Sequence, residues 1–250
     1  MREQSELMRA GDAVGHAQDD PEPHDSIEEW GVFASTTEAL TVTIVAELLR
    51  RTSLNSVPSP VSVIFDGVYA AELDHWNFIR EVFQPSTKRF WIPDGFYGGA
   101  GDALDLTAVG QGVAAGEHLF VNTYLLGVTI FAHAKQSRFA RYAAELAGDE
   151  SEHRVLGQYL AGESPPNNLG FEQFEFSTVS ELEDALRGAG FGFGEQGSAA
   201  GRFYELPEPP ISPTVESSNT SNPRLLGGLA PASDCPSTRC SASSPPSSAA

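Results

Sequence analysis

Apolar side chains recur at three- and four-residue intervals through four long stretches of the chain. That interval is typical of amphipathic α-helices, whose apolar stripe faces a common core. The pattern predicts helices from about Ile27 to Arg51, Pro60 to Phe83, Leu104 to His133 and Gln136 to Ala161. Turn-forming residues in SLNSVPSP predict a hairpin near Asn55, and a second turn is expected near AHAKQS, where no Gly or Pro marks it. The fold class expected from the pattern is all-α.

The segment from Gln84 to Ala103 contains Pro, Gly and several aromatic residues, and it is long enough to run from one end of the helices to the other. Its aromatic run FWIPDGFY predicts that it packs against the helices. After the helix stop in ESPPNNLG, the segment TVSELEDALRGAG predicts one more short helix, with Ser180 and Glu183 as its capping box.

The two ends of the chain differ in composition from the middle. Residues 1–25 include the polar run QDDPEPHD, and residues 207–250 are dominated by Pro, Ser, Ala and Thr. Such segments bury too few apolar side chains to offset the entropy lost on ordering. We therefore expect a disordered segment over 1–25, one helical domain over 26–206 and a disordered Pro/Ser-rich tail over 207–250.

The formal net charge of −19 argues against a nucleic-acid partner, because binding a phosphate backbone requires clustered Lys and Arg. The N-terminus has no apolar run typical of a secretory signal, and no membrane span is expected. Both cysteines, Cys235 and Cys240, lie in the tail, so the domain itself contains no disulfide. These features predict a cytoplasmic protein.

The motif Glu-x-x-His occurs twice, as Glu72 with His75 and as Glu150 with His153. Residues three apart share one face of a helix, so each motif presents a carboxylate and an imidazole in the same direction. Another glutamate precedes each motif, Glu38 by 34 residues and Glu117 by 33. If hairpins turn near Asn55 and near residues 133–134, each upstream glutamate lies level with its motif. The spacing predicts a six-residue metal site, the ligand set known from di-iron and di-manganese helical bundles.

Apolar stripes around these glutamates indicate that they face inward. The stripe through Glu72 carries Phe65, Tyr69 and Trp76, and comparable stripes pass through Glu117 and Glu150. Tyr69 and Tyr124 are interpreted as core-packing residues, although either hydroxyl could bond a ligand. A buried carboxylate requires a compensating partner, and a divalent cation is one such partner.

In the first helix, Glu38 and Glu47 are nine residues apart and point to opposite sides. Glu38 shares its stripe with Val42 and Val45, so it is the predicted ligand. A capping box starting at Ser35 would instead place Glu38 at the helix start, but an equally good box starts at Ser26.

Several segments together resemble bacterial ferritin-like domain proteins of the ferritin and rubrerythrin superfamily: STTEALTVT, VYAAELDHWNFI, RFWIPDG, EHLFVNTYLLG, AAELAGDESEHRVLGQYL and GESPPNNLGFE. The resemblance extends from about Ile27 to Gly194. It implies a ferritin-like up-down four-helix bundle with a long crossover between helices two and three and a short helix after the bundle. It also implies two iron ions, or alternatively manganese, bridged by Glu72 and Glu150 and held at their outer sides by the other four residues.

Two functions remain open at this stage. One is a di-metal oxidoreductase of the ferroxidase, peroxidase, catalase or oxidase type, acting on dioxygen or peroxide in metal metabolism or stress. The other is a non-catalytic ferritin-like stress or structural protein with a degenerate or purely structural metal site. Nothing in the helices identifies the interfaces of a cage, so a monomer or dimer is expected.

Overall fold

The computed structural model describes residues 23–208 and 210–214, and it is mostly helical. Four long helices occupy Ile27–Leu54 (α2), Ser59–Arg80 (α3), Leu106–His133 (α4) and Ser137–Leu160 (α5). A short helix follows at Val179–Gly188 (α6), and a 3-10 turn, η1, spans Asp94–Tyr97. Three strands cover Arg89–Pro93 (β1), Gly192–Phe193 (β2) and Gly201–Glu205 (β3). The helical prediction is confirmed, and the small sheet is an addition that the helical pattern did not predict.

Helix α2 begins at the upstream capping box. The Ser26 side chain accepts a hydrogen bond from the Glu29 amide, and the Glu29 carboxylate accepts one from the Ser26 amide. These bonds satisfy amides that the first helical turn leaves free. Glu38 therefore lies inside α2, three turns from its start, as expected.

The two helical turns also lie where the spacing predicts them. Helix α2 ends at Asn55 and α3 begins at Ser59, while Ala134 to Gln136 separate α4 from α5. Because this second turn has no glycine, Lys135 itself adopts a left-handed conformation with φ of 58°. The turn therefore uses a lysine, a residue type that does not by itself predict a turn.

The capping box predicted for the short helix α6 was wrong by two residues. Thr178, not Ser180, is the N-cap. Its side chain accepts a hydrogen bond from the Glu181 amide, and the Glu181 carboxylate accepts a hydrogen bond from the Thr178 amide. The chain contains two overlapping Ser/Thr-x-x-Glu sequences here, and the earlier one caps the helix. Ser180 then falls in the first turn.

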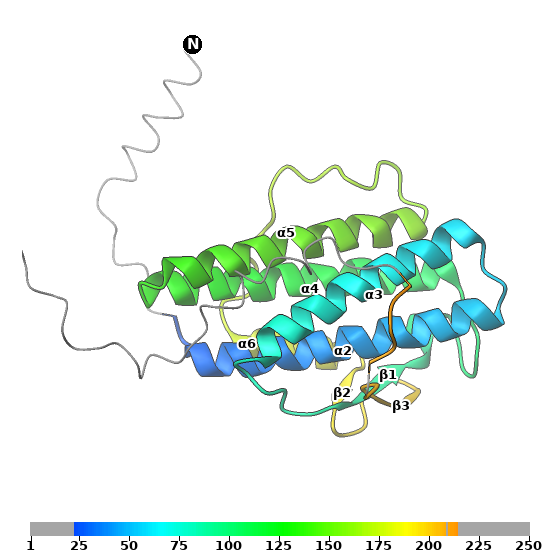
Figure 1. Ribbon diagram of the computed structural model, residues 1–250, viewed down its shortest axis with the longest axis horizontal. Coiled ribbons are helices and arrows are strands. Elements are labelled where there is room, and N and C mark those ends of the chain that lie inside the picture. The colour runs from blue at the N-terminus through cyan, green and yellow to red at the C-terminus, as the bar shows by residue number, and fades with distance from the viewer. Residues whose placement is uncertain (1–22, 209, 215–250) are drawn as a thin grey trace, which may run out of the picture.

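The long helices lie side by side, with α4 and α5 adjacent and α2 between α4 and the sheet (Figure 1). The connection from α3 runs back along the helices through β1, so α3 and α4 point in the same direction (Figure 1). Gly110 and Gly157 allow α4 and α5 to approach closely. A Cβ atom on Gly110 would lie 2.4 Å from the Ala161 amide nitrogen, and one on Gly157 would lie 2.7 Å from that of Ala114.

The crossover between α3 and α4 packs down through β1, as its aromatic residues predict. Phe90 and Ile92 are fully buried and join the core cluster that includes Leu40, Val45 and Tyr69. Strand β1 is the centre of the sheet, with β2 and β3 antiparallel on either side. Its alternation of buried and more exposed residues has the two-residue period of a strand.

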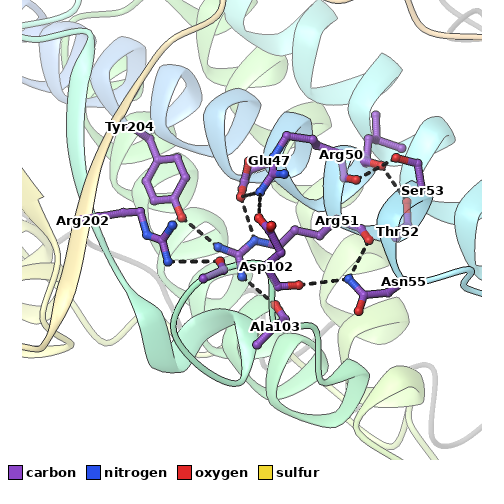
Figure 2. A network of polar contacts seen from close by, with 12 residues as sticks. Glu47, Arg50, Arg51, Thr52, Ser53, Asn55, Asp102, Ala103, Arg202 and Tyr204 are labelled. Atoms are coloured by element: carbon purple, nitrogen blue, oxygen red, sulfur yellow. Dashed lines mark hydrogen bonds and ion pairs between the residues drawn. The ribbon is translucent and has the colours of Figure 1, made fainter.

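Arg51 links the C-terminal end of α2 to the crossover and to strand β3. Its side chain is fully buried, stacks 3.9 Å from the centre of the Tyr97 ring and donates to the Ala103 carbonyl and the Tyr204 hydroxyl. Glu47 accepts from Arg51 at 2.7 Å and from Arg50 at 2.6 Å (Figure 2). Although partial burial alone raises the pKa of Glu47, the two arginines lower it below its ordinary value. Glu47 is therefore a structural ion-pair residue on the side of α2 away from Glu38.

Helix α2 is long and apolar enough to cross a membrane, with a mean hydropathy of 1.5 over its most apolar window. In the folded chain, 89% of that window is buried. A helix buried in the core of a folded protein can have the same length and apolar composition as a membrane span.

Residues 1–22 and 215–250, which hold most of the two predicted disordered segments and both cysteines, lie outside the described residues. Of the predicted tail, residues 207, 208 and 210–214 are described. Thr214 donates to Asp66 on α3 through its amide and its hydroxyl.

Candidate metal centre

All six residues predicted as metal ligands converge in the interior between the long helices. Helix α2 provides Glu38, α3 provides Glu72 and His75, α4 provides Glu117, and α5 provides Glu150 and His153. Each is buried, with no more than 8% of its surface exposed. Six ionisable side chains at this depth make a site of high electrostatic cost unless they are compensated.

The six residues form two overlapping groups. Glu38, Glu72, His75 and Glu150 offer ligand atoms within 4.8 Å of one another, and so do Glu72, Glu117, Glu150 and His153. Glu72 and Glu150 belong to both groups. They therefore occupy the middle of the cluster, with one histidine and one further glutamate on either side.

Both histidines turn Nδ1 towards this middle. Nδ1 of His75 lies 3.2 Å from Glu150 Oε1 and 3.6 Å from Glu72 Oε2. Nδ1 of His153 lies 2.7 Å from Glu72 Oε1 and 3.2 Å from Glu150 Oε2. The two imidazole rings are 6.1 Å apart between centroids.

Several ligand-type atoms of the cluster have no hydrogen-bond partner within the described residues. They are Glu38 Oε2, Glu72 Oε1, Glu117 Oε2, Glu150 Oε1 and His75 Nδ1, all of them buried. Three of these atoms, Glu72 Oε1, Glu150 Oε1 and His75 Nδ1, have only the ion-pair contacts given above. Buried polar atoms are almost always paired, so a group of unpaired ones indicates a binding site. Because most of these atoms are carboxylate oxygens, the species that fits them is a cation.

The two outer glutamates are the most perturbed acids of the site. Burial raises the pKa of Glu38 and of Glu117 well above the ordinary value of 4.5, and the negative charges of Glu150 and Glu72 raise both further. Without a cation, these two carboxyl groups ionise less readily than a free glutamate.

The pKa values of the two histidines are shifted in the direction that favours the charged imidazolium form. Burial alone lowers the pKa of His75 and of His153, but the surrounding carboxylates outweigh it and raise both pKa values well above 6.5. The pKa of Glu150 falls to about 2 because its contacts with both histidines outweigh its burial. In the metal-free protein, protons on the two histidines therefore balance part of the negative charge of the carboxylates.

Asp149 adjoins the cluster and is a residue that the sequence interpretation missed. Its Oδ2 atom lies 2.9 Å from Nε2 of His75 and 3.9 Å from Nε2 of His153. A carboxylate behind the imidazole fixes which ring nitrogen faces the ligand. Its position immediately before Glu150 was the available signal, because it places Asp149 four residues, about one helical turn, from His153.

Tyr124 on α4 is fully buried and donates a hydrogen bond to Glu38 Oε1, so it combines core packing with the bond to a ligand residue that the sequence left open. Tyr69 differs. Its hydroxyl is buried near the backbone of Ile211 and does not bond to the Glu/His cluster, and its ring packs in the core cluster around α2.

The donor set consists of four carboxylates and two imidazoles. Oxygen-rich sets with imidazole suit Fe(II) and Mn(II), whereas structural zinc sites favour four ligands rich in sulfur or nitrogen. Comparison with protein-family models, curated proteins and solved structures found no match. The molecule is a mostly helical protein with a buried Glu/His cluster of metal-binding composition, loosely compatible with the ferritin-like class.

Proposed function

We propose that the chain is a ferritin-like four-helix-bundle protein that binds two iron ions, or alternatively two manganese ions, and acts on dioxygen or peroxide. The observation that carries this proposal is the pair of overlapping ligand groups sharing Glu72 and Glu150. One cation would be held by Glu38 and His75, and the other by Glu117 and His153. Glu72 and Glu150 would contact both.

Two adjacent iron or manganese ions supply a site at which dioxygen or peroxide accepts two electrons in one event. The residues of the chain supply orientation. The Tyr124 hydroxyl holds one oxygen of Glu38, so the other oxygen stays directed into the cluster. Asp149 holds Nε2 of His75, which leaves Nδ1 of His75 available to a cation.

On the side of α2 and α3, the apolar core keeps bulk water from the site. Leu40 and Trp76, each 1% exposed, belong to the cluster of buried apolar side chains that adjoins the centre on α2 and α3. Exclusion of water strengthens the attraction between carboxylates and cations.

Anaerobic titration with Fe(II), followed by oxygen-electrode measurements, tests this function. We expect about two Fe(II) ions per chain and rapid oxygen uptake when air is admitted. Glu72→Ala and His153→Ala should abolish both. His118→Ala is the matched control, because His118 pairs at the surface with Glu175, 3.1 Å away. Absence of iron and manganese binding would contradict the proposal.

A second function also has a specific observation in its favour. The histidine–glutamate contacts of the cluster balance charge within the protein itself, as between His153 Nδ1 and Glu72 Oε1. A site that compensates itself can serve a purely structural role, with or without a metal. Metal binding without oxygen or peroxide consumption would favour this non-catalytic alternative.

A further inference from the structure

A cavity of about 660 Å³ adjoins the candidate metal centre. Glu117 and His153 form part of its wall, and the rest comes from the five helices, the crossover and the segment 189–200 after α6. The volume lies within the roughly 300–1,000 Å³ range of pockets that enclose small organic ligands.

The cavity is elongated along the helices. On α5 its wall runs from His153 to Leu160, and on α4 it runs from Phe120 past Glu117 to Ala108. At 1.5 Å per residue, these segments extend roughly 10 Å and 13 Å from the centre. The wall on α3 reaches from Val68 to Ile64 in the same direction, towards the turn between α2 and α3. A long ligand matches this extent better than a compact one.

The wall is almost entirely apolar. Beyond Glu117 and His153 at the centre, its polar side chains are Thr41 and Gln111. The Thr41 hydroxyl already donates to the Thr37 carbonyl, and Gln111 is exposed at the surface. Water in a cavity requires two to four polar partners, which this wall does not provide along its length.

The cavity also has access to solvent. Val68 and Ile64 on α3, together with Leu156 and Leu160 on α5, line it and are only partly buried. Gly116 lies on its wall next to Glu117, and a Cβ atom there would meet no other atom within 4 Å. The cavity wall therefore reaches the surface, and no side chain fills the space at Gly116.

We propose that this cavity binds an unbranched aliphatic chain, with one end of the chain beside Glu117 and His153. The apolar wall matches the methylene groups, and the single polar end of the cavity matches one functional group. Binding of the chain depends only on the cavity. Its role as a substrate rests on the di-metal function proposed above.

Calorimetric titration with saturated fatty carboxylates from hexanoate to dodecanoate, below their micellar concentrations, tests the binding. Each added methylene should tighten binding about fourfold, until the chain fills the cavity. Binding that does not saturate, or that does not depend on chain length, would overturn the proposal.

Gly116→Leu fills part of the cavity and should weaken dodecanoate binding at least tenfold. It replaces a helical glycine facing open space, so we expect the fold to be retained or stabilised. Gly148→Leu is the matched control: Gly148 is also helical and faces open space, but it is exposed on α5 outside the cavity wall. Equal affinities of the two variants would overturn the proposal.

Mn(II) added to the dodecanoate complex tests where the chain lies. Paramagnetic relaxation should be strong at one end of the bound chain and decrease towards the other, and equal relaxation along the chain would overturn the placement. If the protein binds dodecanoate but no Mn(II), the proposed metal function fails and the cavity proposal stands. If it binds Mn(II) but no aliphatic chain, only the cavity proposal fails.

Discussion

Nε2 of His75 lies 2.9 Å from Oδ2 of Asp149, and this contact joins α3 to α5 directly behind the candidate metal centre. It leaves Nδ1 of His75 directed towards Glu72 and Glu150. The contact therefore ties the orientation of one ligand to a residue that is not itself a ligand.

Asp149→Asn should weaken metal binding at the centre by about 10- to 100-fold, the usual effect of losing a partner that orients a metal-ligating histidine. Competition with a chelator of known affinity measures it. Asp74→Asn is the control, since Asp74 lies inside the first motif and makes no ion pair or hydrogen bond to the described residues. Unchanged metal affinity in Asp149→Asn would show that the contact does not orient the histidine.

Tyr124→Phe removes the donor to Glu38 and leaves a buried carboxylate oxygen without a partner. The loss in free energy of unfolding should be about 1–3 kcal/mol, measured by urea denaturation of metal-free protein. Tyr69→Phe provides the matched control, because it removes a buried hydroxyl that does not bond to the Glu/His cluster. Equal losses in the two variants would contradict a specific role for the bond to Glu38.

Arg51→Leu should lower the free energy of unfolding by about 3 kcal/mol, because it removes a fully buried partner of Glu47 and leaves the Ala103 carbonyl and the Tyr204 hydroxyl without this donor. Arg50→Leu removes the other arginine bound to Glu47. Its side chain is 44% exposed, so a loss below about 1 kcal/mol is expected. A larger effect of Arg50→Leu would show that the buried contact is not the stronger one.

The metal-free protein should lose stability as the pH rises. Glu38 and Glu117 have folded pKa values well above 4.5, and His75 and His153 have values well above 6.5. A group with a raised folded pKa stabilises the fold below its unfolded pKa, and that stabilisation is lost as the pH passes through the folded value. Glu150 acts in the opposite direction, and its contribution is lost only as the pH falls from 4.5 towards 2.

Urea midpoints in the presence of a chelator, measured from pH 5 to pH 9, check this dependence. Metal binding must displace the same protons, so metal affinity should rise with pH and protons should be released on binding. Calorimetry in two buffers of different ionisation enthalpy detects that release. A metal-free stability that rises steadily over this range would contradict the account.

Sequence spacing could predict the positions of the six cluster residues because helical geometry is local. Residues three apart share a face, and a turn near Asn55 places Glu38 level with Glu72. The choice between Glu38 and Glu47 followed from the same geometry, and Glu47 lies in the ion-pair network with Arg50 and Arg51 (Figure 2).

Other features depend on contacts that local patterns do not carry. Phe90 on β1 lies opposite Phe193 and Tyr204, more than 100 residues later in the chain, so the sheet could not be predicted from helical periodicity. The contact from Asp149 to His75 likewise joins two different helices. The capping boxes at Thr178 and Ser180 have the same sequence pattern, and only the folded structure shows that Thr178 caps the helix.

Anomalous X-ray scattering from crystals soaked in Mn(II) tests the central claim most directly. Two peaks are expected, roughly 3.5–4 Å apart, one beside Glu38 and His75 and the other beside Glu117 and His153, with Glu72 and Glu150 between them. Soaked crystals with no peak among these six residues, or with manganese bound only at the acidic surface, would contradict it.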